Sequence, residues 1–415
     1  MFSPQVRVTT PDPNPRKPIS VASLPQGPRT SRTRRTRFVC ISDTHNNTPK
    51  LPKGDVLIHA GDLTNQGTYS ELSKAVSWLA KQPFEIKIVV AGNHDLTLDE
   101  EFYSRQGANL HQTPQNPEAC RRLLSENPGI TYLNHAGATV RLASPSGPRT
   151  IFTVFGSPYS PCQDTGTWAF QYPRDSDEAT RLWSLIPLDT DLLITHTPPY
   201  HHCDESISKR KAMGCEILRK AMWRVRPKLH VCGHVHEGRG AERVKWDISS
   251  GNVAYAERGS EIWEDQSGNG RKMSLVDLTA KTGKVLDNDG CHPAEVSHGA
   301  DDGLHDHTED DDGQAEVSPH HNQPSSSAYR LSRINQTRTD GPSLPGYATH
   351  SLGEAPIRNR SQARSDTEAL RGRTGRRETC VVNCAIAATS YPHIGGKRYN
   401  KPIVIDIDLP VWTLD

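Results

Sequence analysis

Residues 37–45 read Arg-Phe-Val-Cys-Ile-Ser-Asp-Thr-His, an apolar and β-branched run that ends in two metal-ligand side chains, Asp43 and His45. A continuous apolar run of this kind, bounded by polar residues, indicates a short strand that is buried on both faces. Because the carboxyl ends of parallel strands meet at one edge of a sheet, side chains placed there can combine with those that follow other strands. The stretch therefore predicts a layered α/β fold with a polar site at the edge of a sheet.

The same arrangement recurs along the chain, where apolar runs are followed by side chains that can bind a metal ion. Further buried strands are predicted at residues 55–60, 86–91, 150–155, 191–195 and 229–232. Four of these runs lead to the clusters Gly61-Asp62, Gly92-Asn93-His94-Asp95, His196 and Gly233-His234-Val235-His236. One such cluster alone is weak evidence, because buried histidines are common. Five in order, each after a predicted strand, favour one shared site.

Helical patterns lie between the predicted strands. The sequence from Thr68 to Glu71 matches a capping box, and Asn116-Pro117 places proline at the first position of a second helix. Two more helices are predicted at residues 178–185 and 215–223. Alternating strands and helices predict a layered α/β core.

The candidate ligands are oxygen and imidazole donors, with no cysteine among them. They are Asp43, His45, Asp62, Asn93, His196, His234 and His236. This donor set suits two divalent cations, with Mn²⁺ favoured and Fe, Zn²⁺ or Mg²⁺ as alternatives, rather than a structural zinc site. If the Asp62 carboxylate bridges both ions, each ion receives about four protein ligands and keeps room for water and substrate. Two ions about 3.5–4 Å apart can activate a hydroxide that attacks phosphorus. His94, next to a ligand, can then assist the leaving group.

Composition changes divide the 415 residues into four parts. Residues 1–33 form a basic arm rich in Pro, Ser and Thr, for which disorder is expected. Residues 34–283 carry all the ligand clusters and are predicted to form the folded domain. Residues 284–375 form an acidic and then Arg/Ser-rich insertion, also expected to be disordered. Residues 376–415 contain two strand-like runs that would complete the core.

Charge and targeting signals limit the partners and the cellular location that can be expected for the protein. The formal net charge of +1 gives no support for a nucleic-acid partner. No secretory signal and no run of about eighteen apolar residues is visible, so neither export nor a membrane span is expected. The nine cysteines form no C-x-x-C pair, which favours free thiols. These signals favour a cytoplasmic location, with the nucleus as an alternative because of the basic arm, and leave the oligomeric state open.

The five clusters, D-x-H, G-D, G-N-H-[DE], H and G-H-x-H, resemble the calcineurin-like metallophosphoesterase superfamily. Residues 37–45, 87–95 and 226–238 are similar to the small metallophosphoesterase-domain proteins of the 239FB group, which animals and fungi share. The likeness spans the predicted domain and resumes in the last forty residues or so. It implies an α/β fold, a four-layer α/β/β/α sandwich of two mixed sheets with a dimetal site at the strand ends. The resemblance assigns Asp43, His45, Asp62 and His236 to one metal, Asp62, Asn93, His196 and His234 to the other, and the catalytic imidazole to His94.

Asn65 and Gln66 depart from the protein phosphatases of this superfamily, which have an Asp that orients the catalytic imidazole and an Arg that grips phosphate at these places. The prediction is therefore hydrolysis of a small phosphodiester, with a cyclic nucleotide as one candidate. Alternatives are a phosphomonoesterase, a nuclease or, from another class, a metal-binding scaffold or regulator with negligible turnover. Because no ligand is missing, His234 included, the enzyme is favoured over the scaffold.

Seven polar residues near the clusters are open to two interpretations, contact with the site or a structural role: His59, His201, His202, Asp204, His230, Arg239 and Arg243. For His230 the structural role is favoured. The aromatic loop at 156–161, together with Trp168 and Phe170, could form a wall for a nucleotide base. Aromatic packing beneath the loop is the alternative.

Overall fold

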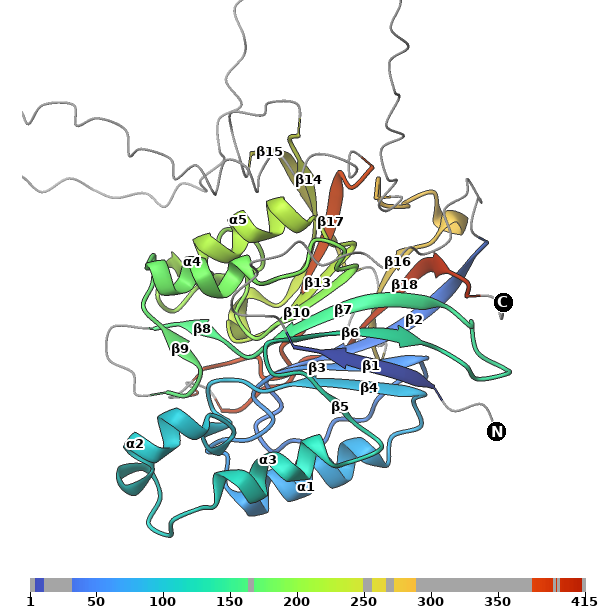
Figure 1. Ribbon diagram of the computed structural model, residues 1–415. Helices are drawn as coiled ribbons and strands as arrows, with labels where there is room; N and C mark the ends of the chain where they lie inside the picture. Colours follow the sequence, from blue (N-terminus) through green and yellow to red (C-terminus); the bar gives the residue numbers. More distant parts are fainter. Residues whose placement is uncertain are drawn as a thin grey trace, which may run out of the picture. The chain divides into compact units, whose positions relative to one another are not determined.

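The computed structural model describes residues 4–10, 32–162, 168–248, 256–265, 272–288, 375–390, 393 and 396–412. Two large mixed sheets form the centre of this part of the chain (Figure 1). Most of the predicted insertion at 284–375 lies outside the described residues, as does most of the basic arm.

The six-stranded sheet carries the first three ligand clusters. Its order is β16 (Ser274–Leu278), β18 (Ile403–Pro410), β2 (Thr33–Ile41), β3 (Val56–Ala60), β4 (Ile86–Val90) and β5 (Thr131–Tyr132). The four strands from β2 to β5 are parallel, whereas β18 runs antiparallel to β2. The carboxyl ends of β2, β3 and β4 therefore open at the same edge.

The eight-stranded sheet carries the remaining clusters. Its order is β1 (Gln5–Thr9), β6 (Ala136–Arg141), β7 (Ile151–Ser157), β10 (Leu192–Thr195), β13 (Leu229–Cys232), β17 (Glu378–Asn383), β14 (Gly240–Trp246) and β15 (Glu257–Ile262). The central strands β7, β10, β13 and β17 are parallel. The strands on either side of them, β6 and β14, are antiparallel to their neighbours.

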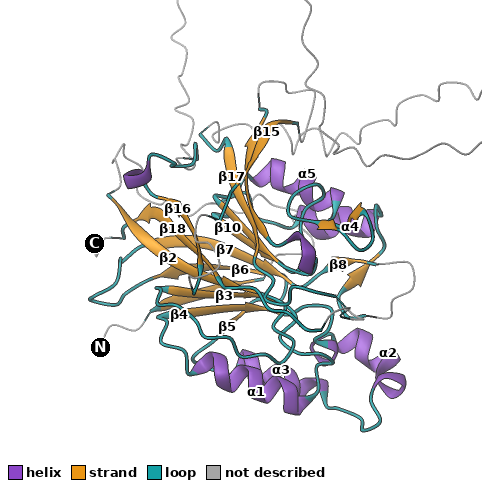
Figure 2. Cartoon of the chain, turned by 180° about the vertical axis from the view of Figure 1, so that it is seen from behind, coloured by secondary structure: helices purple, strands orange, loops and turns teal. Residues whose placement is uncertain are grey.

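The two sheets pack face to face, and helices cover their outer faces (Figure 2). Between the sheets the rings of Phe38 and Phe152 pack edge to face, with their centroids 5.4 Å apart. The outer face of the six-stranded sheet is covered by α1 (Tyr69–Ala80), α2 (Glu100–Leu110) and α3 (Pro117–Ser125). The other sheet is covered by α4 (Asp177–Ser184) and α5 (Glu216–Val225). The predicted four-layer α/β/β/α fold is confirmed.

Local signals explain where the helices begin. Thr68 and Glu71 form the complete capping box at the start of α1. Asn116 caps α3 by accepting from the Ala119 amide, and proline follows it at the first helical position. Helix α5 ends at Arg226, whose backbone is in the left-handed conformation with a φ of 49°.

The last segment of the chain supplies interior strands to both sheets. β17 lies between β13 and β14, and β18 lies between β16 and β2. The N-terminal arm differs from the expectation of disorder over five residues, because β1 pairs antiparallel with β6. The sequence of β1, Gln-Val-Arg-Val-Thr, alternates polar and β-branched residues. It is too short to alter the composition of the arm, yet it fits the open edge of β6.

Short elements lie in the loops near the strand ends. They are the strand pairs β8 (Ser160–Pro161) with β9 (Gln171–Tyr172) and β11 (Glu205–Ser206) with β12 (Lys211–Ala212), and the 3₁₀ helices η1 (Leu96–Leu98), η2 (His236–Gly238) and η3 (Ala280–Thr282).

Within the described ranges, none of the helices has both the length and the apolar character needed to cross a membrane. The eight cysteines in these ranges are free thiols.

Candidate metal centre

The seven candidate ligands and His94 come together at the carboxyl ends of parallel strands from both sheets. The D-x-H residues follow β2, Asp62 follows β3 and Asn93 follows β4. From the other sheet, His196 follows β10 and the G-H-x-H residues follow β13. Backbone hydrogen bonds join the two sheets here: the Ser42 amide donates to the Cys384 carbonyl at 3.1 Å. The site is therefore built across the meeting edges of the two sheets.

Four of the candidate ligands have left-handed backbone conformations. The φ angles are 51° at Asp43, 45° at His45, 55° at Asp62 and 67° at His234. Each such residue costs about 1–3 kcal/mol and persists only where the surroundings impose the conformation. Here the Asp43 amide donates to the Gly61 carbonyl at 2.9 Å, and the His45 amide donates to the Asp62 carbonyl at 3.2 Å. These bonds hold the first two clusters together and turn their side chains toward one site.

One group of ligand atoms gathers around His236. Its Nε2 atom lies 3.3 Å from Asp43 Oδ1 and 3.3 Å from His45 Nε2. The same His45 nitrogen lies 3.7 Å from Asp62 Oδ2. These four residues are the set that the resemblance assigns to one metal.

A second group gathers around Asn93 and His196. The Asn93 Oδ1 atom lies 3.0 Å from His196 Nε2 and 2.8 Å from His234 Nδ1. The two imidazole nitrogens are themselves 3.3 Å apart. His196 Nε2 also lies 3.4 Å from Asp62 Oδ1. Asp62 thus presents one carboxylate oxygen to each group, the arrangement that a bridging ligand requires.

Hydrogen bonds to the backbone fix the tautomers of three imidazoles. The Nδ1–H of His45 donates to the Thr64 carbonyl at 3.2 Å, that of His196 to Ala60 at 3.0 Å, and that of His236 to Thr389 at 3.1 Å. A carbonyl only accepts, so in each neutral ring Nε2 keeps its lone pair. Two such lone pairs face each other at 3.3 Å in His45 and His236, which is unfavourable unless a proton, favoured on His236 by the adjacent Asp43, or a metal ion lies between them. The donor set therefore fits divalent metal ions.

Burial and charge shape the protonation of the site. Burial lowers the pKa of His45 to about 4 and that of His234 to about 3, so both rings are neutral donors near pH 7. Burial also lowers the pKa of His196, but the adjacent Asp62 carboxylate raises it to about 9. Burial raises the pKa of Asp62, yet the facing His196 and His94 hold it well below its usual value. A proton and a metal ion therefore compete for His196.

His94 is held at the site by its backbone and by one ring nitrogen. Its amide donates to Asp62 Oδ1 at 2.8 Å, and its Nδ1–H donates to the Asn65 carbonyl at 2.8 Å. The Trp168 ring lies over the imidazole with centroids 4.2 Å apart. His94 also has a ligand atom within 4.8 Å of those of His45 and Asp62. Its second nitrogen therefore remains for a ligand or a proton at the site.

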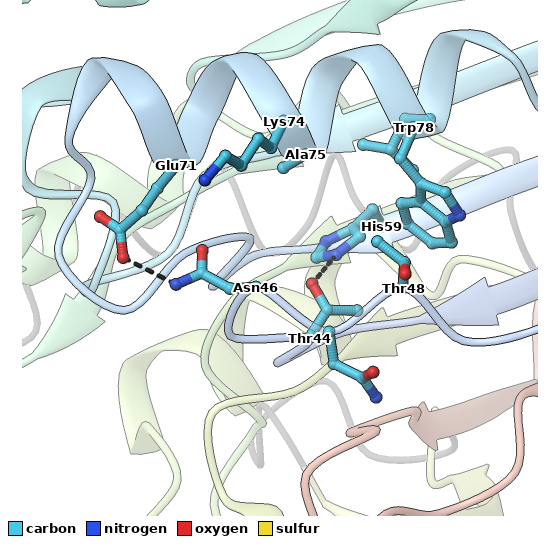
Figure 3. Close-up of a pocket in the computed structure, with 10 residues that line it drawn as sticks. Thr44, Asn46, Thr48, His59, Glu71, Lys74, Ala75 and Trp78 are labelled. Carbon is cyan, nitrogen blue, oxygen red and sulfur yellow. Dashed lines mark hydrogen bonds between the residues drawn. The ribbon is translucent and has the colours of Figure 1, made fainter.

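Two further contacts brace the loops that carry the ligands. The buried Asp95 carboxylate accepts from the amides of Leu63, Thr64 and Gly92 at 2.9–3.2 Å, tying the second cluster to the third. Behind the D-x-H loop, Thr44 Oγ1 lies 2.9 Å from His59 Nε2 (Figure 3). His59 lines a cavity of about 220 Å³ between this loop and α1. Its contact is with Thr44, the residue between two ligands, so His59 supports the loop from behind.

Several residues with two interpretations have structural contacts. His202 lies between Glu242 and Glu257, at 2.9 and 3.1 Å. His230 Nε2 lies 2.7 Å from Thr195 Oγ1. The remaining four also bond to nearby protein groups: Asp204 to the amides of His201 and Gly214, Arg239 to Ser274 and the Lys401 carbonyl, and Arg243 to Glu378. These residues are not in the lining of the cavity above the metal centre.

The cavity above the metal centre has a volume of about 740 Å³. Trp168 lies in its wall, as one interpretation of the aromatic loop expected, whereas the Phe170 side chain is packed in the core. Sequence reasoning missed part of the cavity lining, namely Lys397, Arg398 and Tyr399. The only signal for them is a short basic and aromatic run far from every ligand cluster.

Comparison with known proteins agrees with this geometry. The family profile of calcineurin-like phosphoesterases matches residues 36–238. UPF0046 protein K07C11.7 of Caenorhabditis elegans is 35% identical over 236 residues, which are 55% of this chain and 71% of that protein. The human metallophosphoesterase domain-containing protein 1 is 42% identical over 218 residues, covering 49% of this chain and 62% of that protein. The chain belongs to the calcineurin-like metallophosphoesterase family.

One similar protein has an unrelated name. The probable rhamnogalacturonate lyase C of Emericella nidulans is 45% identical over 214 residues, covering 51% of this chain. The match spans only 18% of that protein, so most of that protein lies outside the aligned region. The chain thus spans less than two thirds of the human relative and under a fifth of the fungal one.

Proposed function

We propose that this chain is a dimetal-dependent phosphodiesterase. The observation that carries the proposal is the position of Asp62, whose two carboxylate oxygens face separate groups of ligand atoms. Asp43, His45 and His236 complete one group, and Asn93, His196 and His234 complete the other. Bound divalent ions, of which Mn²⁺ is favoured by the mixed oxygen and nitrogen donors, would lower the pKa of a shared water and neutralise phosphoryl oxygens.

The residues of the chain contribute orientation and proton transfer. His94 is fixed at Nδ1 by the Asn65 carbonyl, so its Nε2 can hold a proton for the leaving oxygen. Asp95 keeps the loops carrying Asp62 and Asn93 in register through three backbone amides. Preorganised polar groups of this kind are effective because they need not reorient during the reaction.

A diester is favoured over a monoester by charge. A monoester phosphate carries more negative charge than a diester and benefits more from a guanidinium beside the metals. Gln66 lines the cavity where the related protein phosphatases have that arginine. The cavity of about 740 Å³ is within the usual range for small-molecule sites, which supports a substrate as large as a nucleotide. A cyclic nucleotide is the candidate that combines both properties.

The test compares two chromogenic esters with the purified, Mn²⁺-loaded chain. We expect kcat/KM for bis-p-nitrophenyl phosphate to exceed that for p-nitrophenyl phosphate. Faster turnover of the monoester would contradict the diester preference. The absence of turnover with either ester, or unchanged turnover in Asp62→Ala, would favour the metal-binding scaffold instead.

A further inference from the structure

Resting on the proposed function, we infer that Lys397 and Arg398 form a second anion subsite. The preferred substrates are then phosphodiesters of nucleotide size that carry an additional phosphate group. The scissile phosphate would lie at the metal centre and the additional phosphate at these two cations. The inference stands on the position of the segment, its charge and the aromatic side chains around it.

Backbone pairing fixes this segment beside the metal centre. The Ala388 amide donates to the Arg398 carbonyl at 2.9 Å, and Ala387 pairs with Tyr399 in an isolated antiparallel bridge. The Ala387 amide in turn donates to the carbonyl of Asp43 at 3.1 Å. Successive backbone contacts therefore connect a ligand residue, the segment that follows β17 and the basic segment. The backbone that carries the two cations is therefore held beside the site.

The charge of the segment is available to a ligand. Lys397 and Arg398 are exposed, line the same cavity as Asp62 and His94, and have no ion-pair partner among the residues that the structure describes. Besides the candidate ligand Asp62, the cavity lining contains the carboxylate of Glu237, which accepts from Ser206 Oγ at 2.8 Å and from the Ser208 amide at 3.1 Å. Because these donors turn Glu237 toward the β11 loop, it leaves the two cations uncompensated. Arginine in particular suits phosphate because its guanidinium can donate two parallel hydrogen bonds.

Two large aromatic side chains remain exposed in the same cavity. Trp168 is 36% exposed and Tyr399 is 51% exposed, although both rings are largely apolar. An exposed aromatic ring beside cationic side chains is a common arrangement for stacking a nucleobase while its phosphates are neutralised. The metal centre, the two rings and the two cations together match a nucleotide with phosphate groups at two positions.

The experiment measures binding, so that it does not depend on turnover. Thymidine 3′,5′-bisphosphate and thymidine 5′-monophosphate are titrated separately into the full Mn²⁺-loaded chain by calorimetry at low ionic strength. We expect the bisphosphate to bind about tenfold more tightly, the order of magnitude of two partly exposed charge contacts. In the variant Lys397→Ala/Arg398→Ala, the two ligands should bind with nearly equal affinity.

A matched variant controls for loss of charge alone. Lys53→Ala/Lys281→Ala removes two exposed cations that do not line the cavity, and it should keep the tenfold preference.

Equal affinities in the unaltered chain, no binding of either ligand, or a preference that survives in the Lys397/Arg398 variant would each overturn the inference. A chain that hydrolyses bis-p-nitrophenyl phosphate but lacks the preference refutes only the subsite. A chain that prefers the bisphosphate but hydrolyses no diester refutes only the proposed function.

Discussion

The Nδ1 atom of His94 lies 2.8 Å from the carbonyl oxygen of Asn65, and this contact determines how the imidazole can act. The backbone carbonyl selects the Nδ1–H tautomer, as a carboxylate would, but it adds no negative charge. Nε2 is thereby directed to the cavity that the ligands line. The contact also shows that the orientation of the ring does not require the Asp that the related protein phosphatases have in place of Asn65: the main chain, not the side chain, positions the ring.

His94→Ala should reduce turnover without removing the metal ions. Because general acid catalysis by a positioned imidazole contributes about 10²–10⁴-fold, we expect kcat for bis-p-nitrophenyl phosphate to fall within that range. Metal content, measured on the same preparation, should remain unchanged. His201→Ala, which alters an exposed histidine outside the cavity, serves as the control. Loss of a metal ion from the His94 variant would show that His94 is a ligand and that its proposed role is wrong.

Asn93→Ala should empty mainly one of the two metal positions. The Asn93 Oδ1 atom lies within 3.0 Å of ligand nitrogens from His196 and His234, and it is not in the group around His236. Elemental analysis should therefore give close to one Mn²⁺ per chain instead of two. The exposed Asn134→Ala provides a matched asparagine control. Two ions bound as tightly as before would contradict the assignment of Asn93.

Gly233→Ala should disrupt the metal centre through sterics alone. A Cβ at this position would overlap the Ser42 hydroxyl and the Asp43 carboxylate. We expect the free energy of unfolding to fall by about 1–3 kcal/mol, the usual range for overpacking, together with weaker metal binding. Urea denaturation and metal analysis would measure the two effects. Gly240→Ala is the control, because a Cβ there meets no atom within 4 Å. Equal stability and metal content in the two variants would refute the argument.

His202 should make the stability of the chain depend on pH. Burial lowers the pKa of His202, but its contacts with Glu242 and Glu257 raise it from 6.5 to about 9. Protonated His202 therefore stabilises the folded chain, and this contribution to the free energy of unfolding is complete below pH 6.5 and is lost as the pH rises through about 9. The contribution is at most about 3 kcal/mol. Urea denaturation at pH 6 and pH 9.5 should show a larger loss in the unaltered chain than in His202→Gln. Identical pH dependence in both proteins would contradict the account.

The sequence predicts those parts of the fold that depend on local patterns. The predicted strand at residues 229–232 has the same bounds as β13, and the capping box at Thr68 starts α1 as expected. Helix α2 was not predicted, because its apolar pattern is weak and a tertiary contact helps to define its start. Its cap residue, Asp99, also accepts from the distant Phe170 amide at 2.7 Å. Boundaries that depend on such contacts have no local signature.

The same distinction applies to the site. The ligand candidates are recognisable because each follows a strand within a few residues. The basic segment at Lys397 is not, since it reaches the site only through pairing of residues 387–388 with 398–399 and through the carbonyl of Asp43. The structural role of His202 was equally hidden, because its partners Glu242 and Glu257 are forty and more residues away. Local sequence therefore indicates the chemistry of the centre but not the residues that complete the cavity around it.

The most direct test of the central claim is a titration of the metal-free chain with Mn²⁺, in which bound metal and hydrolysis of bis-p-nitrophenyl phosphate are measured in the same samples. We predict that activity rises with metal binding and reaches its maximum at two ions per chain, with Asp62→Ala failing to reach either plateau. Full activity in the metal-free chain, or two bound ions without any hydrolysis of the diester, would contradict the account.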